Sequence, residues 1–95
     1  QKSAVHVHSQ AASRTVRMEC DVRGMALDEA LMEVERYLDE AMRSNISPVR
    51  IIHGKGTGVL RKTVQQMLRR DPRVKSFRLG RYGEGEMGVT VVELK

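Results

Sequence analysis

Several kinds of residue are scarce in this chain, and each scarcity excludes a class of protein. Its 95 residues include one cysteine, two prolines, one phenylalanine, two tyrosines and no tryptophan. The single Cys20 cannot form an internal disulfide, which predicts a reducing, cytoplasmic setting and a buried, unreactive thiol. No apolar run approaches the ~20 residues that span a bilayer, and no stretch resembles a signal peptide. We therefore expect a cytoplasmic protein with no membrane partner.

The length of the chain allows one domain at most. Because the chain begins at Gln1 rather than at methionine, we expect it to be a piece of a longer protein. Residues 1–15 are rich in serine, alanine and glutamine, so we interpret them as a linker or tail and residues 16–95 as the domain. Within the tail, residues 5–8 alternate like a short strand. His6 and His8 have a spacing that suits two metal ligands, but no cysteine or acidic residue lies beside them, so an incidental edge strand is favoured.

Negative charge is scarce in the second half of the chain. The net charge is +5, and residues 28–43 hold six acidic and two basic residues, whereas residues 50–81 hold ten basic residues and one acidic residue. A domain this polarised attracts a polyanion to one face and repels it from the other. The predicted partner is therefore nucleic acid, either DNA or RNA. The alternative is a solvated basic helix that only keeps the domain soluble.

Hydrophobic periodicity predicts six elements in the order βαβαββ. Apolar residues recur at helical spacing in residues 27–44 and 58–70, and at strand spacing in residues 16–23, 49–53, 74–79 and 89–94. A right-handed crossover makes the first two strands parallel, and the last two form a hairpin whose loop, residues 80–88, is expected to be exposed and mobile. The predicted fold class is α/β, an α+β two-layer sandwich with a mixed four-stranded sheet, both helices on one face and the other face open. Leu27 and Val59 belong to the apolar stripes that the two helices are expected to bury.

The most informative stretch is the turn at residues 53–58, which carries a histidine, a lysine and three glycines between a strand and a helix. Gly54, Gly56 and Gly58 allow backbone N–H groups to turn inward, and the helix that follows directs the positive end of its dipole to the same point. Lys55 adds a positive charge, and His53 adds a side chain that titrates near neutral pH. The pattern predicts a phosphate-sized anion site with a proton-transfer group beside it. A tight glycine-rich turn without a ligand is the alternative.

Two strand ends look alike in this sequence. Asp21 and Arg23 end one strand and His53 ends the next, each just before a glycine. Because parallel strands end at the same side of a sheet, about 5 Å apart, we expect these side chains to converge with Lys55. The set suits phosphodiester hydrolysis, with Arg23 and Lys55 holding phosphate oxygens and His53 moving a proton. The alternative is that the set binds phosphate and catalyses nothing.

Asp21 has two expected roles in this set. It either orients His53 or holds a divalent cation such as Mg²⁺ or Mn²⁺. It is the only candidate metal ligand. A single carboxylate provides too few oxygen ligands for a divalent cation, so no metal is assigned.

Further nucleic-acid contacts are expected around the turn. They comprise Gly54, Gly56, Thr57, Gly58, Arg61, Lys62, Arg81 and Tyr82. Tyr82 either stacks on a base or covers the end of the hairpin.

Three segments resemble the signature blocks of the Smr (small MutS-related) domain. They are Cys-Asp-Val-Arg-Gly at residues 20–24, Ile-His-Gly-Lys-Gly-Thr-Gly-Val-Leu-Arg at residues 52–61, and Gly-Val-Thr-Val-Val-Glu-Leu at residues 88–94. The resemblance covers residues 16–95. Arg23, together with the amino-terminal linker, makes the chain most similar to the Smr domain that ends bacterial proteins of the second MutS family.

That resemblance implies the two-layer fold shared with the carboxy-terminal domain of translation initiation factor three. It implies a nicking endonuclease with little sequence preference that acts on branched DNA or recombination intermediates, in a homodimeric parent that suppresses homologous recombination. The ATP of that parent belongs to an upstream ATPase and clamp region, absent here. The same family is linked to collided ribosomes, which implies the alternative of a non-catalytic module that binds RNA or the ribosome. Many Smr nucleases carry histidine where this chain has Arg23; because arginine stays protonated, His53 is left as the proton-transfer candidate.

Overall fold

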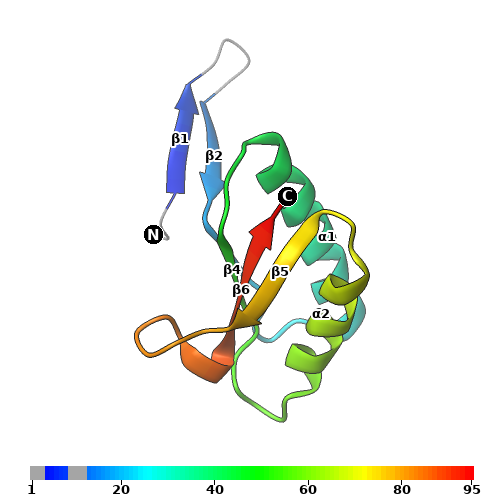
Figure 1. The fold of residues 1–95 in the computed structure, drawn as a ribbon. Helices are drawn as coiled ribbons and strands as arrows, with labels where there is room; N and C mark the ends of the chain where they lie inside the picture. Colours follow the sequence, from blue (N-terminus) through cyan, green and yellow to red (C-terminus); the bar gives the residue numbers. More distant parts are fainter. Residues whose placement is uncertain (1–3, 9–12) are drawn as a thin grey trace.

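The computed structural model describes residues 4–8 and 13–95, and its main body is a four-stranded sheet covered on one face by two helices (Figure 1). The elements are β1 (Ala4–His8), β2 (Ser13–Arg17), β3 (Glu19–Asp21), α1 (Leu27–Arg43), β4 (Val49–Ile52), α2 (Val59–Arg70), β5 (Val74–Leu79), the 3₁₀ helix η1 (Glu86–Gly88) and β6 (Val89–Leu94). From β3 onward the strands and α-helices follow the predicted order βαβαββ, and the predicted fold class is confirmed. Neither α-helix in this described part has the length and apolar character needed to cross a membrane.

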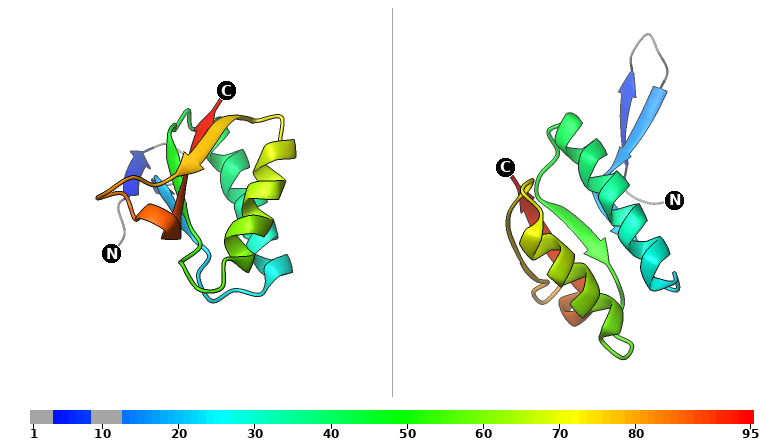
Figure 2. Two further views of the ribbon diagram at one scale, coloured as in Figure 1. Left: turned by 60° about the horizontal axis from the view of Figure 1, so that its bottom comes forward. Right: turned by 90° about the vertical axis from the view of Figure 1, so that its right-hand side faces the viewer.

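The sheet has the strand order β3-β4-β6-β5 (Figure 2). β3 and β4 are parallel, as predicted for a βαβ unit, with Cys20 opposite Ile51. β6 lies between β4 and β5 and is antiparallel to both. Ile52, the last residue of β4, is opposite Asp21 on one side and Val89 on the other. The ends of β3 and β4 therefore meet the start of β6 at one end of the sheet.

The core lies between the sheet and the helices. Strands contribute alternate residues to it, and helices contribute residues at three- and four-residue spacing. Its fully buried apolar members are Val22, Ala30, Val34, Leu38, Ala41, Val49, Ile51, Val64 and Val92. Leu27 and Val59, which we expected to be buried, are 43% and 50% exposed because each is the first residue of its helix, at the margin of the packed layer. Cys20 is buried as predicted, and burial raises the pKa of its thiol to about 12, which makes it unreactive.

The predicted first strand, residues 16–23, is divided between two strands in the structure. β2 ends at Arg17, the chain bends at Met18, and β3 begins at Glu19. β2 pairs antiparallel with β1 in a separate two-stranded sheet, whereas β3 pairs with β4. The expectation of one strand is wrong because the two halves have different partners, although their alternation is continuous in sequence. β1 contains the strand expected at residues 5–8.

Two predictions about the amino-terminal segment are not tested. β2 crosses the predicted boundary between residues 15 and 16, and the division into tail and domain stays a prediction. The metal-binding alternative for His6 and His8 concerns side chains outside the described part of the chain.

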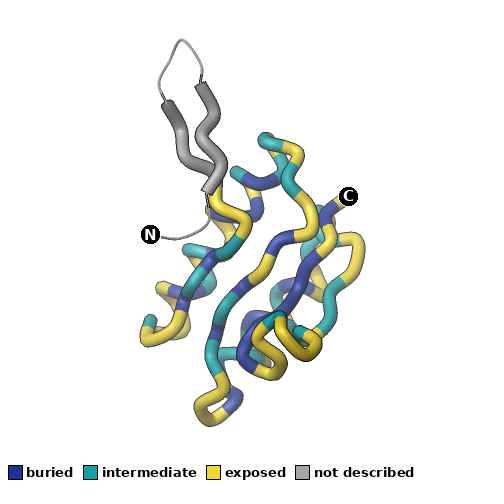
Figure 3. The backbone as a smooth tube through the Cα atoms, turned by 90° about the vertical axis from the view of Figure 1, so that its left-hand side faces the viewer, coloured by how far each residue is buried: buried dark blue, intermediate teal, exposed yellow. Residues whose placement is uncertain are grey.

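The loop at residues 80–88 folds over the sheet face that carries no helix. Glu84 anchors it, since Oε1 accepts from Arg78 Nη1 over 2.8 Å and from the Arg81 N–H over 2.7 Å. Val89 and Val91 are consequently only 7% and 6% exposed. Figure 3 shows burial that alternates along the first residues of β4 but is nearly continuous along β6. This face carries no helix, as predicted, but it is only partly open because the 80–88 loop covers Val89 and Val91.

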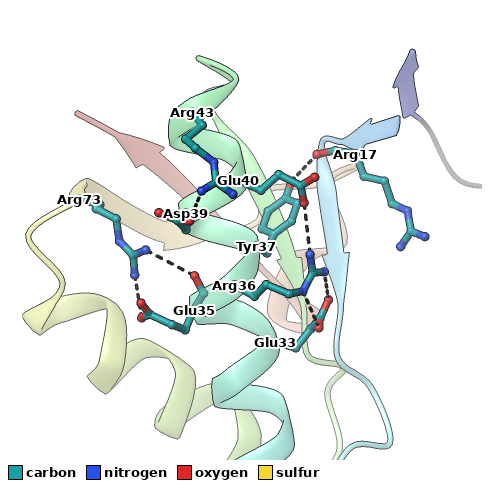
Figure 4. Close-up of polar contacts among 9 residues, drawn as sticks. All are labelled: Arg17, Glu33, Glu35, Arg36, Tyr37, Asp39, Glu40, Arg43 and Arg73. Carbon is teal, nitrogen blue, oxygen red and sulfur yellow. Dashed lines mark hydrogen bonds and ion pairs between the residues drawn. The ribbon is translucent and has the colours of Figure 1, made fainter. Parts of the chain in front are cut away.

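The acidic residues of α1 form ion pairs on its outer face (Figure 4). Arg36 lies between Glu33 and Glu40, with N···O distances of 2.6 and 3.3 Å. Arg73, from the basic half of the chain, pairs with Glu35 at 2.7 Å. Exposed pairs of this kind add little stability. They do neutralise much of the charge of α1, so the exposed positive charge is concentrated elsewhere.

Candidate nucleic-acid interface

The ends of β3 and β4 lie side by side, as the sequence predicted. The Val22 N–H donates to Ile52 O over 2.9 Å, which continues the parallel pairing to the ends of the strands. Beyond this bond the Arg23 side chain lies against Gly54, because a Cβ added at Gly54 would be 3.3 Å from Arg23 Cγ. Arg23 therefore shares a surface with the loop at residues 54–58.

Asp21 holds the Arg23 guanidinium in a bidentate ion pair. Arg23 Nε is 2.9 Å from Asp21 Oδ1, and Nη2 is 2.7 Å from Oδ2. The Arg23 backbone N–H also donates to Oδ1 over 3.1 Å. The Arg23 side chain remains 60% exposed, against 17% for Asp21. The carboxylate thus orients a guanidinium that still faces solvent, an arrangement that suits an anion clamp.

The loop at residues 54–58 places three glycines in the left-handed region. φ is +81° at Gly54, +33° at Gly56 and +88° at Gly58. α2 begins at the next residue; its N-cap, Gly58, makes no side-chain bond, and its first turn has no acidic residue. The Val59 N–H donates to Thr57 Oγ1 over a long 3.4 Å. Among the described residues, the backbone N–H groups of Gly56 and Thr57 have no hydrogen-bond acceptor. A loop of this shape before a helix N-terminus can accept an anion.

Two further cations flank this loop. Lys55 is exposed within it. Arg61 folds back over it, since Arg61 Nη2 would be 3.1 Å from a Cβ added at Gly58. Within the described part of the chain, neither cation forms an ion pair. We refer to Arg23, the 54–58 loop and Arg61 as the cationic cradle.

His53 is not an exposed proton-transfer group beside the anion site, so that expectation of the sequence analysis is wrong. The residue is 5% exposed. Its Nε2 is 2.8 Å from Thr90 Oγ1, and its Nδ1 is 3.0 Å from Gly54 O. Burial lowers the pKa of His53 below its ordinary value of 6.5, against the smaller opposing effect of the bond to Gly54. Asp21 does not orient this ring, because Asp21 faces the other side of the sheet, where it holds Arg23.

The residues around Asp21 do not suit a divalent cation. In residues 4–8 and 13–95, no group of three histidine, cysteine, aspartate or glutamate side chains is placed to hold a metal ion. The Asp21 carboxylate is engaged by Arg23, and hard cations need several oxygen ligands. No chemical step is therefore assigned to Mg²⁺ or Mn²⁺, and a metal requirement stays a prediction.

The remaining predicted contacts lie on two elements. Lys62 is exposed and follows Arg61 on α2, beside the cradle. Arg81 and Tyr82 belong to the first part of the 80–88 loop, which extends from the helix-free side of the sheet (Figure 2), whereas the last residue of the loop, Gly88, is bonded to Gly54. Tyr82 is 95% exposed, so it does not cover the end of the hairpin. The structure thus brings Lys62, but not Arg81 or Tyr82, to the cradle.

Two residues beside His53 were not predicted from the sequence. Thr90 of β6 is completely buried, and Gln65 of α2 donates from Nε2 to Thr90 Oγ1 over 3.2 Å. The signal that could have found them is the alternation of β4. His53 lies two residues after the buried Ile51 and so shares its helix-facing side, where a polar ring needs polar partners.

The chain matches known proteins over nearly all of the region just described. The family model of the Smr domain matches residues 20–95. The chain is 58% identical over 83 residues to the protein named Endonuclease MutS2 of Acetivibrio thermocellus, which covers 87% of this chain. It is 57% identical over 82 residues, or 86% of the chain, to the protein of that name from Clostridium tetani. Each match covers 10% of the relative, so the chain spans about a tenth of the length of these relatives.

Two solved structures share the fold. The Smr domain of Thermus thermophilus MutS2 has a TM-score of 0.79 at 51% identity, over 81% of this chain and 96% of that one. YdaL, a stand-alone small MutS-related protein from Escherichia coli, has a TM-score of 0.78 at 21% identity, over 82% and 64% of the two chains, and supports the fold alone. Sequence, fold and family model agree, and the chain belongs to the Smr domain family.

Proposed function

We propose that this domain binds the phosphates of DNA in the cationic cradle and nicks one strand with little sequence preference. The observation that carries the proposal is the meeting of three anion-binding features at one point. They are the guanidinium of Arg23 held by Asp21, the glycine-rich 54–58 loop and the start of α2, whose N-cap residue Gly58 has no side chain to cap it. The printed name of the relatives, Endonuclease MutS2, supports the same reaction class.

Catalysis in this proposal is electrostatic. Arg23 and Lys55 bind the non-bridging oxygens of the scissile phosphate, and the start of α2 adds positive partial charge. Water adds to phosphorus and loses a proton to solvent, while the ester bond to the leaving oxygen breaks and that oxygen takes a proton from solvent. The proton transfers are assigned to solvent because both nitrogens of His53 are bonded within the protein.

The finer parts of the proposal follow from the family resemblance. The substrate is branched DNA or a recombination intermediate, and the longer parent, a homodimer with its ATP site upstream, suppresses homologous recombination. Arg61 and Lys62 extend the contact to neighbouring phosphates along α2. The protein acts in the cytoplasm, at the nucleoid or the ribosome.

The second candidate is a non-catalytic module that binds RNA or the ribosome during rescue of collided ribosomes. The observation that favours it is the burial of His53, at 5% exposure, because the one side chain suited to proton transfer is then kept from the bound phosphate. The cationic cradle is equally compatible with both candidate functions, because DNA and RNA both offer phosphates to bind.

A plasmid-nicking assay tests the first candidate. The pure chain is expected to convert supercoiled plasmid to open circles. Arg23→Ala and Lys55→Ala are each expected to lower the rate by about 10²-fold or more, as loss of a preorganised donor does in other enzymes. Lys75→Ala is the matched control, because Lys75 is an exposed cation near the opposite end of the sheet. Equal rates in all four proteins would identify the nicking as background; a parallel series with chelator tests for a metal.

Binding at several salt concentrations separates the two candidates. A module without turnover binds duplex DNA or RNA with a strong salt dependence but leaves plasmid intact. Each lost phosphate contact is expected to reduce the slope of log K against log salt by about 0.9 on duplex DNA. Replacing Arg61 and Lys62 by alanine should weaken binding to every sequence alike. An affinity that does not change with salt would contradict both candidates.

A further inference from the structure

A continuous line of hydrogen bonds joins α2 to the 54–58 loop through the core. Gln65 Nε2 donates to Thr90 Oγ1 over 3.2 Å, and Thr90 Oγ1 is 2.8 Å from His53 Nε2. His53 Nδ1 is in turn 3.0 Å from Gly54 O. Thr90 is fully buried and His53 nearly so. The line therefore connects three separate segments of the chain, and its central bond, between Thr90 and His53, is buried.

The chemistry of the acceptors sets the direction of these bonds. A carbonyl oxygen only accepts, so His53 Nδ1 carries the hydrogen and donates to Gly54 O. In the neutral ring Nε2 is then an acceptor, and it receives the hydroxyl hydrogen of Thr90. The Thr90 oxygen accepts from Gln65. Within the described part of the chain, no buried side-chain nitrogen or oxygen lacks a partner, so the line is complete.

The last bond of this line, from His53 Nδ1 to Gly54 O, sets the orientation of the peptide group between Gly54 and Lys55. The carbonyl of Gly54 and the N–H of Lys55 belong to one trans peptide plane, in which they point in opposite directions. By holding Gly54 O toward the core, His53 turns the Lys55 N–H away from the core. The Gly54 N–H is held by Gly88 O at 2.9 Å. Both peptide groups that adjoin Gly54 are thus fixed.

We propose that His53 is a positioning residue, which together with Thr90 and Gln65 fixes the Gly54–Lys55 peptide so that the loop binds phosphate. The proposal rests on the proposed function for the identity of that phosphate, which belongs to a nucleic acid. His53 acts through Gly54 and neither touches the phosphate nor transfers a proton. A neutral imidazole suits this place because it offers one donor and one acceptor at opposite sides of a rigid ring.

Substitutions at His53 separate positioning from proton transfer. In His53→Asn the amide N–H can replace Nδ1–H as donor to Gly54 O, but asparagine does not titrate near neutral pH. His53→Leu keeps apolar bulk and has no donor. We expect His53→Asn to keep DNA affinity and nicking within about threefold of the original chain. His53→Leu should lose about tenfold or more, because the part-buried carbonyl of Gly54 and the buried hydroxyl of Thr90 both lose their partner.

Substitutions at Thr90 give a second measurement that leaves the histidine in place. Thr90→Ser keeps the hydroxyl, whereas Thr90→Val has nearly the same shape without it. The amide NMR signals of Lys55 and Gly56 are expected to shift most in His53→Leu, which loses the donor to Gly54 O. They should shift less in Thr90→Val and His53→Asn, which keep that donor but lose the bond between residues 53 and 90, and stay close to their original positions in Thr90→Ser. This measurement needs no DNA, and it keeps the proposal testable if His53→Leu does not fold.

Two outcomes would overturn the positioning role. One is loss of nicking in His53→Asn while the loop amides keep their positions. The other is a nicking rate whose pH profile shows a transition between about pH 5 and 8 that disappears in His53→Asn. Arg61 of α2, the charged group that acts on the ring, is present in every variant. If the original chain neither binds nor nicks DNA, the proposed function fails, and the amide signals still decide whether His53 sets the loop.

Discussion

The ends of β3 and β4 resemble each other in sequence and are built in opposite ways. Each is followed by a glycine in the same conformation, with φ of +80° at Gly24 and +81° at Gly54. After β3, Arg23 lies on the surface in a bond to Asp21. After β4, His53 is buried and bonded within the core. One end exposes its polar group to solvent, and the other bonds its polar group to the backbone of Gly54.

The difference follows from alternation along the two strands. Arg23 comes one residue after Val22, which is fully buried, so it takes the opposite face of the sheet. His53 comes two residues after Ile51, also fully buried, so it takes the same face. The chemistry available to a polar residue at a strand end therefore depends on its distance from the last buried residue, and not on its distance from the glycine.

The largest expected effect that sharpens this comparison comes from the two glycines. An alanine at φ near +80° costs about 1–2 kcal/mol. In Gly24→Ala this should be the whole loss, because no atom lies within 4 Å of the added Cβ. Gly54→Ala should lose more stability, and also DNA affinity, because its Cβ would be 3.3 Å from Arg23 Cγ. Urea unfolding and DNA binding of both variants measure the difference, and equal losses would show that Arg23 simply moves aside.

A smaller effect is expected in the pH dependence of stability. Because the pKa of His53 is lower in the folded state than its ordinary 6.5, the unfolded chain binds a proton first as pH falls. The contribution of His53 to the free energy of unfolding is full above pH 6.5 and is lost as pH falls from there through the folded-state pKa. Arg23 stays charged over this range and contributes no such change.

The measurement is urea unfolding at several pH values for the original chain and His53→Asn. The variant should lose this part of the pH dependence, while His6 and His8 remain in both proteins and cancel. Identical pH profiles would mean that the ring is not held in its neutral form.

The smallest expected effect concerns Asp21. Asp21→Asn removes a negative charge next to the cradle, and one unit charge at 4 Å in water is worth ~1 kcal/mol, so duplex DNA should bind at most about fivefold more tightly. The nicking rate per bound complex should fall, because Arg23 loses its bidentate partner. The amide signal of Gly54 should not move, since Asp21 does not contact His53. Weaker DNA binding would contradict the view that the negative charge of Asp21 repels the phosphates while its carboxylate orients Arg23.

Much of the fold could be predicted because its signals are local. The α2 and α1 patterns matched the observed helices to within one residue, and β5 and β6 matched at both ends. Arg23 and the 54–58 loop could be placed together because parallel strands of a βαβ unit end on the same side. The break at Met18 could not be predicted, since the alternation runs through it unchanged. The burial of Val91 under the 80–88 loop depends on the bond between Glu84 and Arg78, and no local sequence pattern predicts that contact.

By itself, the sequence determined the order of helices and strands, the glycine-rich turn before α2 and the cationic character of that end of the sheet. These depend on the spacing of apolar residues, on glycine and on charge, all of which act over a few residues. Only the tertiary structure decided that the Asp21 carboxylate pairs with Arg23 and that His53 Nδ1 is bonded to the carbonyl of Gly54. His53 and Thr90 are 37 residues apart, and their bond exists because β6 inserts beside β4 under α2.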